Sequence, residues 1–149
     1  MSDLKNRVTD DMKSAMRSKE KLRLLTVRTI LAAIKQQEVD TREDVDDTAI
    51  LVILDKMCKQ RRESITQFKK AGRNDLVAQE EAELEIIQVY LPEPMSDDEL
   101  QTLIAETMAT TGANSMQDMG KVMSIIKPKA QGRADMGKIS GMIKAQLSS

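Results

Sequence analysis

The spacing of the apolar residues constrains this chain more than any other feature. They recur every three or four positions in nearly every segment, as in Leu24, Val27, Ile30, Leu31 and Ile34, and nowhere do they alternate along a run. This spacing places apolar side chains on one face of an α-helix. Only three prolines interrupt the 149 residues, and Leu, Met, Ala, Glu, Lys and Gln favour helix. We therefore predict an all-α fold.

Polar caps and breaks divide the N-terminal part into successive helices. Ser2 is placed to cap the first helix, and a second begins near Lys19. The second carries the broadest apolar stripe, so it is predicted to be the most enclosed helix of the fold. A polar connection over Asp40–Asp47 precedes a long third helix, which Gly72 is suited to end. A fourth helix follows an N-cap segment at residues 73–75 and runs to about Tyr90.

Two prolines mark the expected domain boundary. Pro92 and Pro94 each lack an amide donor and bias the preceding residue away from helix. We expect an N-terminal multi-helix domain over residues 1–91 and a small three-helix C-terminal domain over residues 92–149.

The C-terminal domain has its own caps and breaks. Ser96 and Glu99 have capping-box spacing, and Met116 is predicted to face the core of the middle helix. The expected helices run from Ser96 to Gly112, from Ser115 to just before Pro128, and from Asp135 to the end of the chain.

Composition excludes several kinds of chemistry. The chain has no histidine and one cysteine, Cys58, so it can form neither a Ser/His or Cys/His nucleophile nor an internal disulfide. The aspartates at residues 44–47 lack the glycine and glutamate of a calcium loop. We expect Cys58 in the core, and no catalytic residue, metal or cofactor. Residues 1–13 do not resemble a targeting segment and no apolar run could span a membrane, so a cytoplasmic location is expected.

Charge is balanced overall but unevenly distributed. From Lys56 to Arg73 there are seven cations and one acid, and an acidic segment follows. Two antiparallel helices whose charged faces attract each other would explain this. A secondary anion site at Lys59, Arg61 and Arg62 is the alternative. Arg23 lies within the apolar stripe of the second helix and is predicted to pair with a carboxylate of a packed helix.

The C-terminal residues hold the second basic region. Residues 92–118 contain six acids and no cation, whereas residues 119–149 contain six cations and one acid. The segment Lys127–Arg133 is predicted to form a turn that leads into a helix N-terminus, where free amides and the helix dipole favour a phosphate. Alternatively, Asp135 caps that helix and fills the site. The predicted anion-binding residues are Lys127, Lys129 and Arg133, with Lys121 and Lys138 at the flanks and Gly132 permitting close approach.

Several motifs together resemble the YqeY family. They are Lys59-Gln60-Arg61-Arg62-Glu63-Ser64, Ala71-Gly72-Arg73-Asn74-Asp75-Leu76, Tyr90-Leu91-Pro92, Met119-Gly120-Lys121-Val122-Met123 and Lys129-Ala130-Gln131-Gly132-Arg133-Ala134-Asp135. That family is similar to the helical tail domain of the B subunit (GatB) of glutamine-dependent aspartyl/glutamyl-tRNA amidotransferase. The resemblance implies a two-part helical fold and contact with the outer body of a tRNA.

Three functional hypotheses follow. The first is a non-catalytic module that binds structured RNA, in particular tRNA, through phosphate contacts. With only one Tyr and one Phe, the chain lacks the aromatic platform of single-strand readers. The second, implied by the resemblance, is an accessory subunit of a carbon–nitrogen ligase that uses glutamine as amide donor. The third is a helical adaptor for a protein partner.

Overall fold

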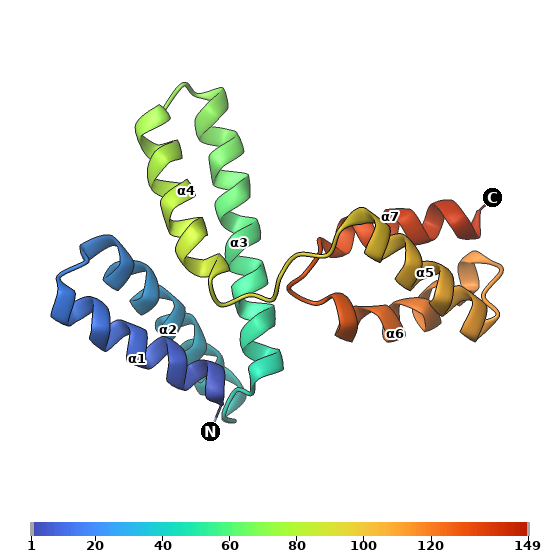
Figure 1. The fold of residues 1–149 in the computed structure, drawn as a ribbon, viewed down its shortest axis with the longest axis horizontal. Coiled ribbons are helices and arrows are strands. Elements are labelled where there is room, and N and C mark those ends of the chain that lie inside the picture. Colours follow the sequence, from blue (N-terminus) through green and yellow to red (C-terminus); the bar gives the residue numbers. More distant parts are fainter. Residues whose placement is uncertain (1, 149) are drawn as a thin grey trace. The chain divides into compact units, whose positions relative to one another are not determined.

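Helices account for most of the chain. In a computed structural model that describes residues 2–148, those residues contain seven α-helices, one 3₁₀ turn and no strand (Figure 1). The all-α prediction is confirmed. The elements are α1 (Asp3–Ser18), α2 (Lys21–Thr41), α3 (Asp47–Lys70), α4 (Asn74–Gln88), α5 (Asp97–Thr111), η1 (Met116–Asp118), α6 (Met119–Ala130) and α7 (Met136–Leu147).

The chain divides into two compact units, Met1–Leu91 and Pro92–Ser149, here called the N-terminal and C-terminal units. Each unit has its own apolar core. In the C-terminal unit α6 packs against both α5 and α7, and the buried residues are Leu100, Ile104, Val122, Ile126, Ala130, Ile139, Ile143 and Leu147.

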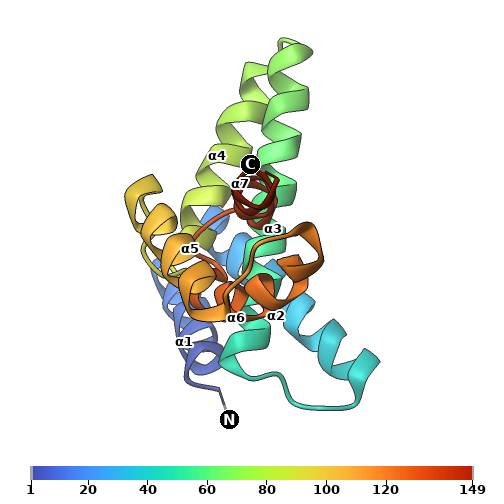
Figure 2. The same ribbon diagram turned by 90° about the vertical axis from the view of Figure 1, so that its right-hand side faces the viewer.

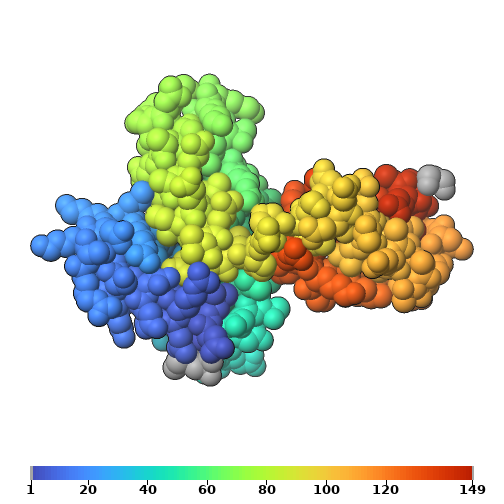
Figure 3. Space-filling view, viewed as in Figure 1, coloured from blue at the N-terminus to red at the C-terminus, as the bar shows by residue number. Residues whose placement is uncertain are grey.

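The N-terminal unit consists of two helical hairpins, α1–α2 and α3–α4. The helices of the second hairpin lie side by side in both ribbon views (Figures 1 and 2), and its outer end stands clear of α1 and α2 (Figure 3). At that end Ile65 of α3 and Val77 of α4 are buried. The main core of this unit includes Val8, Val27, Ile30, Ile34, Ile50, Leu54, Cys58 and Ile87.

The prediction that the second helix is the most enclosed is wrong. One face of α2 is buried, but its opposite face leaves Leu25 58% and Val39 60% exposed. Both α2 and α3 pack against the other three helices of the unit, but α3 buries six of its 24 residues whereas α2 buries four of 21, so α3 is the more enclosed helix. The residues of α2 supply apolar side chains for two faces, and the N-terminal unit covers one of them.

Several predicted helix ends are confirmed by their hydrogen bonds. The Ser2 hydroxyl accepts from the Lys5 amide at 3.1 Å, and the Ser96 hydroxyl accepts from the Glu99 amide at 3.1 Å. Gly112 ends α5 with a φ of +69°, a left-handed conformation that glycine adopts without a steric penalty. These ends depend on local chemistry, which is why sequence alone predicts them.

Other ends differ from the prediction. The N-cap residue of α4, Arg73, makes no side-chain capping bond, because a guanidinium has no acceptor for a backbone amide; it pairs with Asp75 at 3.1 Å. At the other end α4 stops at Gln88, and Tyr90 lies buried in the turn that follows.

The largest difference concerns the middle C-terminal helix. Pro128 was expected to lie beyond its end, but α6 continues through Pro128 to Ala130. The proline lies in the last turn, where the single missing donor breaks only one helical hydrogen bond. Met116 was predicted to face the core but is 46% exposed, because Met116–Asp118 form a 3₁₀ turn before α6 begins.

Candidate nucleic-acid interface

The cations predicted to surround one turn are distributed over a helix and the turn that follows. Lys127 and Lys129 belong to the last turn of α6, whereas Gly132 and Arg133 lie in the α6–α7 connection. Residues two apart on a helix point to different sides, so Lys127 and Lys129 diverge. Gly132 has a φ of +78°, so the turn itself requires a glycine.

Arg133 holds the start of the C-terminal unit in place. Its Nε donates to the Glu93 carbonyl at 2.7 Å, and its Nη2 lies 3.3 Å from Glu99 Oε2. The Arg133 carbonyl in turn accepts from the Met95 amide at 2.9 Å. These contacts give Arg133 a structural role in joining the α6–α7 turn to the residues before α5.

The N-terminus of α7 is occupied by the chain itself. The Asp135 carboxylate accepts from the Gly137 amide at 3.1 Å, which is the alternative foreseen from sequence. Lys138, in the first turn of α7, pairs with Asp97 of α5. A carboxylate therefore already satisfies this helix end, and one flanking cation is neutralised.

Four lysines of the C-terminal unit remain exposed and form no ion pair within residues 2–148. They are Lys121, Lys127 and Lys129 of α6 and Lys144 of α7. The acid nearest to α6 in sequence, Asp118, is engaged elsewhere. Hydrogen bonds from the Asn114 and Ser115 amides lower the pKa of Asp118, with a smaller contribution from Lys121.

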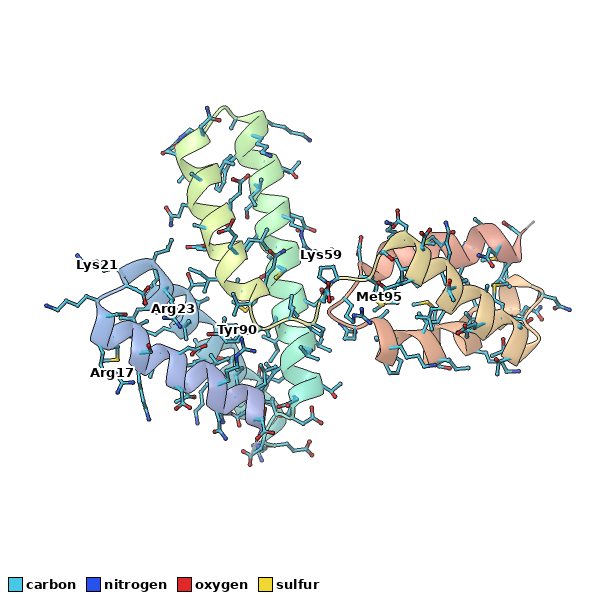
Figure 4. All side chains as sticks on the ribbon, in the orientation of Figure 1. Arg17, Lys21, Arg23, Lys59, Tyr90 and Met95 are labelled. Atoms are coloured by element: carbon cyan, nitrogen blue, oxygen red, sulfur yellow. The ribbon has the colours of Figure 1, made fainter. Side chains whose placement is uncertain are left out.

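A more compact group of cations lies on α3. Lys56, Lys59 and Arg62 are all exposed and follow one another at intervals of three residues. This spacing places all three side chains on one face of the helix. Lys59 is labelled in Figure 4. We call Lys56, Lys59 and Arg62 the α3 cation group. Lys56 was not among the predicted site residues, although its spacing from Lys59 was visible.

Arg61 points the other way, toward α4. Its Nε lies 3.1 Å from Glu83 Oε2 and 3.7 Å from Glu80 Oε2, and it is buried without hydrogen-bond geometry to either. Lys69 also faces α4, at 3.9 Å from Glu81. The predicted attraction between oppositely charged antiparallel helices is confirmed at these contacts. Of the three residues predicted for the secondary site, Arg61 is therefore the least available to a ligand.

A polar cluster joins α1, α2 and the end of the N-terminal unit. Arg23 lies 3.7 Å from Asp11 of α1 and 2.9 Å from Glu20, which confirms its predicted ion pair (Figure 4). The Tyr90 hydroxyl donates to the same Asp11 carboxylate at 2.6 Å. The guanidinium of Arg7 lies 5.0 Å from the centre of the Tyr90 ring. No motif predicted that Tyr90 joins this cluster, because it lies 79 positions from Asp11 in the sequence.

Cys58 is fully buried, as predicted. Burial raises the pKa of its thiol to about 11, so the unreactive thiol form dominates at neutral pH. Within residues 2–148 no three His, Cys, Asp or Glu side chains are grouped so that they could hold a metal ion.

Comparison with known proteins identifies the family. A family model described as Yqey-like protein matches residues 5–147. The chain belongs to this family. Among curated YqeY-like relatives, altered inheritance of mitochondria protein 41, mitochondrial, from Lachancea thermotolerans is 33% identical over 144 residues, covering 92% of this chain and 77% of that protein.

Two further relatives carry the same name. The Pyrenophora tritici-repentis protein is 34% identical over 129 residues, covering 83% of this chain and 71% of that protein. The Eremothecium gossypii protein is 44% identical over 82 residues, covering 54% of this chain and 45% of that protein. That match therefore spans less than half of the fungal protein. No helix within residues 2–148 is long and apolar enough to cross a membrane.

Proposed function

We propose that this YqeY-like chain is a non-catalytic module that binds structured RNA, in particular tRNA, through contacts with phosphates. One observation carries the proposal: the α3 cation group presents three exposed charges on one helix face. The unpaired lysines of α6, at positions 121, 127 and 129, provide a second set of phosphate contacts. Arg133 and Lys138 serve chiefly to hold the C-terminal unit together.

Two properties of the chain favour structured RNA. The resemblance between the YqeY family and the tail domain of the tRNA amidotransferase B subunit points to the body of a tRNA. The exposed cations suit backbone phosphates, and the single Tyr is buried, so it offers no face for base stacking.

Binding of a tRNA transcript at two salt concentrations tests the proposal. Each neutralised phosphate releases counterion, so three contacts should lower affinity by roughly 40-fold between 50 and 200 mM salt. The double variant Lys59→Glu/Arg62→Glu should weaken binding by about tenfold or more at fixed salt. Lys127→Glu/Lys129→Glu tests the α6 lysines in the same way.

The control is Lys13→Glu, a reversal of an exposed lysine three residues after Asp10 on α1. It should leave affinity within about twofold. Equal losses in all three variants would indicate a general effect of net charge and contradict a defined site. Unchanged binding by the α3 double variant would remove the α3 cation group from the proposal.

The alternative function, an accessory subunit for amide transfer from glutamine, has a direct assay. The full chain is incubated with glutamine, ATP and misacylated tRNA, and the amidated product is measured. Turnover by this chain alone would overturn the non-catalytic proposal. The buried thiol of Cys58 gives no support to a nucleophilic role. The cytoplasmic location stays a prediction, and the fungal relatives are named as mitochondrial.

A further inference from the structure

The exposed face of α2 carries two parallel rows of residues spaced by seven. One row is cationic and consists of Lys21, Arg28 and Lys35, all of them exposed, and exposed Arg42 adds a further charge just beyond the end of the helix. The adjacent row is small or apolar and consists of Leu25, Ala32 and Val39, also exposed. Seven residues make nearly two helical turns, so each row follows the helix for about 20 Å. We call the two rows together the α2 face.

The apolar row is not needed by the N-terminal unit itself. Val27, Ile30 and Ile34 on the opposite side of α2 already fill the core. Leu25 and Val39 are 58% and 60% exposed, and Leu22 lies beside Leu25 at 37%. A helix with apolar residues on two faces is typical of one that is covered on both.

The two ends of the α2 face differ in charge. At the far end Lys35 and Arg42 border a hollow that also contains Glu38, Glu43 and Asp44, so acids of the chain offset these cations. At the near end the excess is uncompensated. Arg17 in the last turn of α1 and Lys19 of the α1–α2 turn add to Lys21, and the one acid there, Glu20, is held by Arg23 and Ser18. Arg17 and Lys21 are labelled at this end of the α1–α2 hairpin in Figure 4.

We propose that the α2 face docks an acidic amphipathic helix of a partner protein. An apolar stripe with a charged flank at seven-residue spacing is the pattern by which one helix pairs with another. The cationic row selects acidic residues on the partner. Ala32 and Thr29 in the middle let the second helix approach closely, while Leu25 and Val39 pack at either side of the crossing.

A hollow beside the α2 face adds an anchor point. It has a volume of ≈ 330 Å³ and opens between α2 and α3. It is lined by Ala33, Ile53 and Met57, by glutamine amides such as Gln36, and by one acid, Asp40, and one cation, Lys56 of the α3 cation group. Interfaces obtain much of their affinity from a few side chains inserted into such hollows. A partner helix that lies along α2 would place one of its side chains in this hollow.

Other occupants fit the α2 face less well. A nucleic acid would contact the cations, but its phosphates would not bury the apolar side chains of Leu25 and Val39. A lipid surface binds large apolar side chains, whereas the residues between Leu25 and Val39 on this side of α2 are Thr29, Ala32 and Gln36. A second copy that pairs antiparallel through the same face would bring two cationic rows together.

A designed peptide serves as the probe. It has three heptads with Leu at both apolar positions and Glu at the flanking positions, so it cannot pair with itself. Binding to the full chain is measured by fluorescence anisotropy. We expect the acidic peptide to bind and a version with Lys in place of Glu not to bind. The variants Leu25→Ser/Val39→Ser and Arg28→Glu should each weaken binding at least tenfold.

Matched controls lie elsewhere in the N-terminal unit. Val89 is 59% exposed, so Val89→Ser mimics the loss of Val39, and Lys70→Glu mimics the reversal of Arg28. Both controls should bind within twofold of the wild type, and all variants should keep its thermal midpoint because every changed side chain is exposed.

Four results would overturn the proposal. The first is that the acidic peptide does not bind the wild type more tightly than it binds Leu25→Ser/Val39→Ser. The second is capture by phosphatidylglycerol vesicles that depends on Leu25, which would assign the face to lipid. The third is self-association in sedimentation that the double variant abolishes. The fourth is a tenfold loss of tRNA affinity in the double variant, which would make the face part of the RNA interface.

Discussion

Tyr90 shows how much one side chain contributes where distant segments meet. Its hydroxyl donates to Asp11 across 79 positions of sequence, and its ring is buried beside Arg7. We expect Tyr90→Phe to lower the free energy of unfolding by about 1.5 kcal/mol, because a hydrogen bond to a carboxylate is lost and the acceptor keeps its desolvation. Urea denaturation at neutral pH measures this difference.

The same hydrogen bond predicts a dependence on pH. Burial, and then the neighbouring Asp11 carboxylate, raise the pKa of Tyr90 in the folded chain above its ordinary value near 10. The unfolded chain therefore loses this proton at a lower pH than the folded chain. The stability advantage of the wild type over Tyr90→Phe should be complete below about pH 10 and shrink as pH rises further. An advantage that grows with pH would contradict this assignment.

At the scale of the element, the α3–α4 hairpin depends on the pairing of Arg61 with Glu83. Both side chains are largely buried, so Arg61→Met leaves a carboxylate without its counter-charge. We expect a loss of about 2 kcal/mol in the free energy of unfolding. Arg62→Met, at the next residue but exposed, should change stability by less than about 0.5 kcal/mol while weakening tRNA binding. Similar stability in both variants would refute the structural role of Arg61.

The prediction of elements from sequence succeeded where the cause was local. The caps at Ser2 and Ser96 and the glycine end at Gly112 follow from a few neighbouring residues. Whether Arg61 or Arg62 faces α4 depends on the rotation of two helices, which no short motif encodes. For the same reason the sequence predicted that α2 is enclosed but not that one of its faces is open.

At the scale of the whole molecule, the two units have separate cores and should unfold separately. The only Tyr and the only Phe lie in the N-terminal unit, so tyrosine fluorescence reports on that unit alone. Ile104 is fully buried in the C-terminal unit, and Ile104→Ala should destabilise it by about 3 kcal/mol. Far-UV circular dichroism should then show an earlier partial transition while the fluorescence transition stays in place. A parallel shift of both signals would show that the units unfold together.

Sequence alone anticipated the family and the helical class of the whole molecule, because ordered motifs extend over nearly the full chain. The candidate site was harder to predict. Counting charges drew attention to residues 119–149, but Arg133 and Lys138 proved to be matched by Glu99 and Asp97 of α5. Pairing across helices decides which cations stay available, and composition does not reveal it.

Both ends of α2 adjoin a cation in the left-handed conformation, Lys19 and Arg42, each with a φ of 59°. Glycine adopts this conformation without the steric penalty of a side chain, which is on the order of 1 kcal/mol. Lys19→Gly should therefore raise the thermal midpoint of the protein and, by removing a cation beside the α2 face, lower its affinity for the acidic peptide. Directed evolution toward heat resistance would consequently tend to remove charges that adjoin the α2 face.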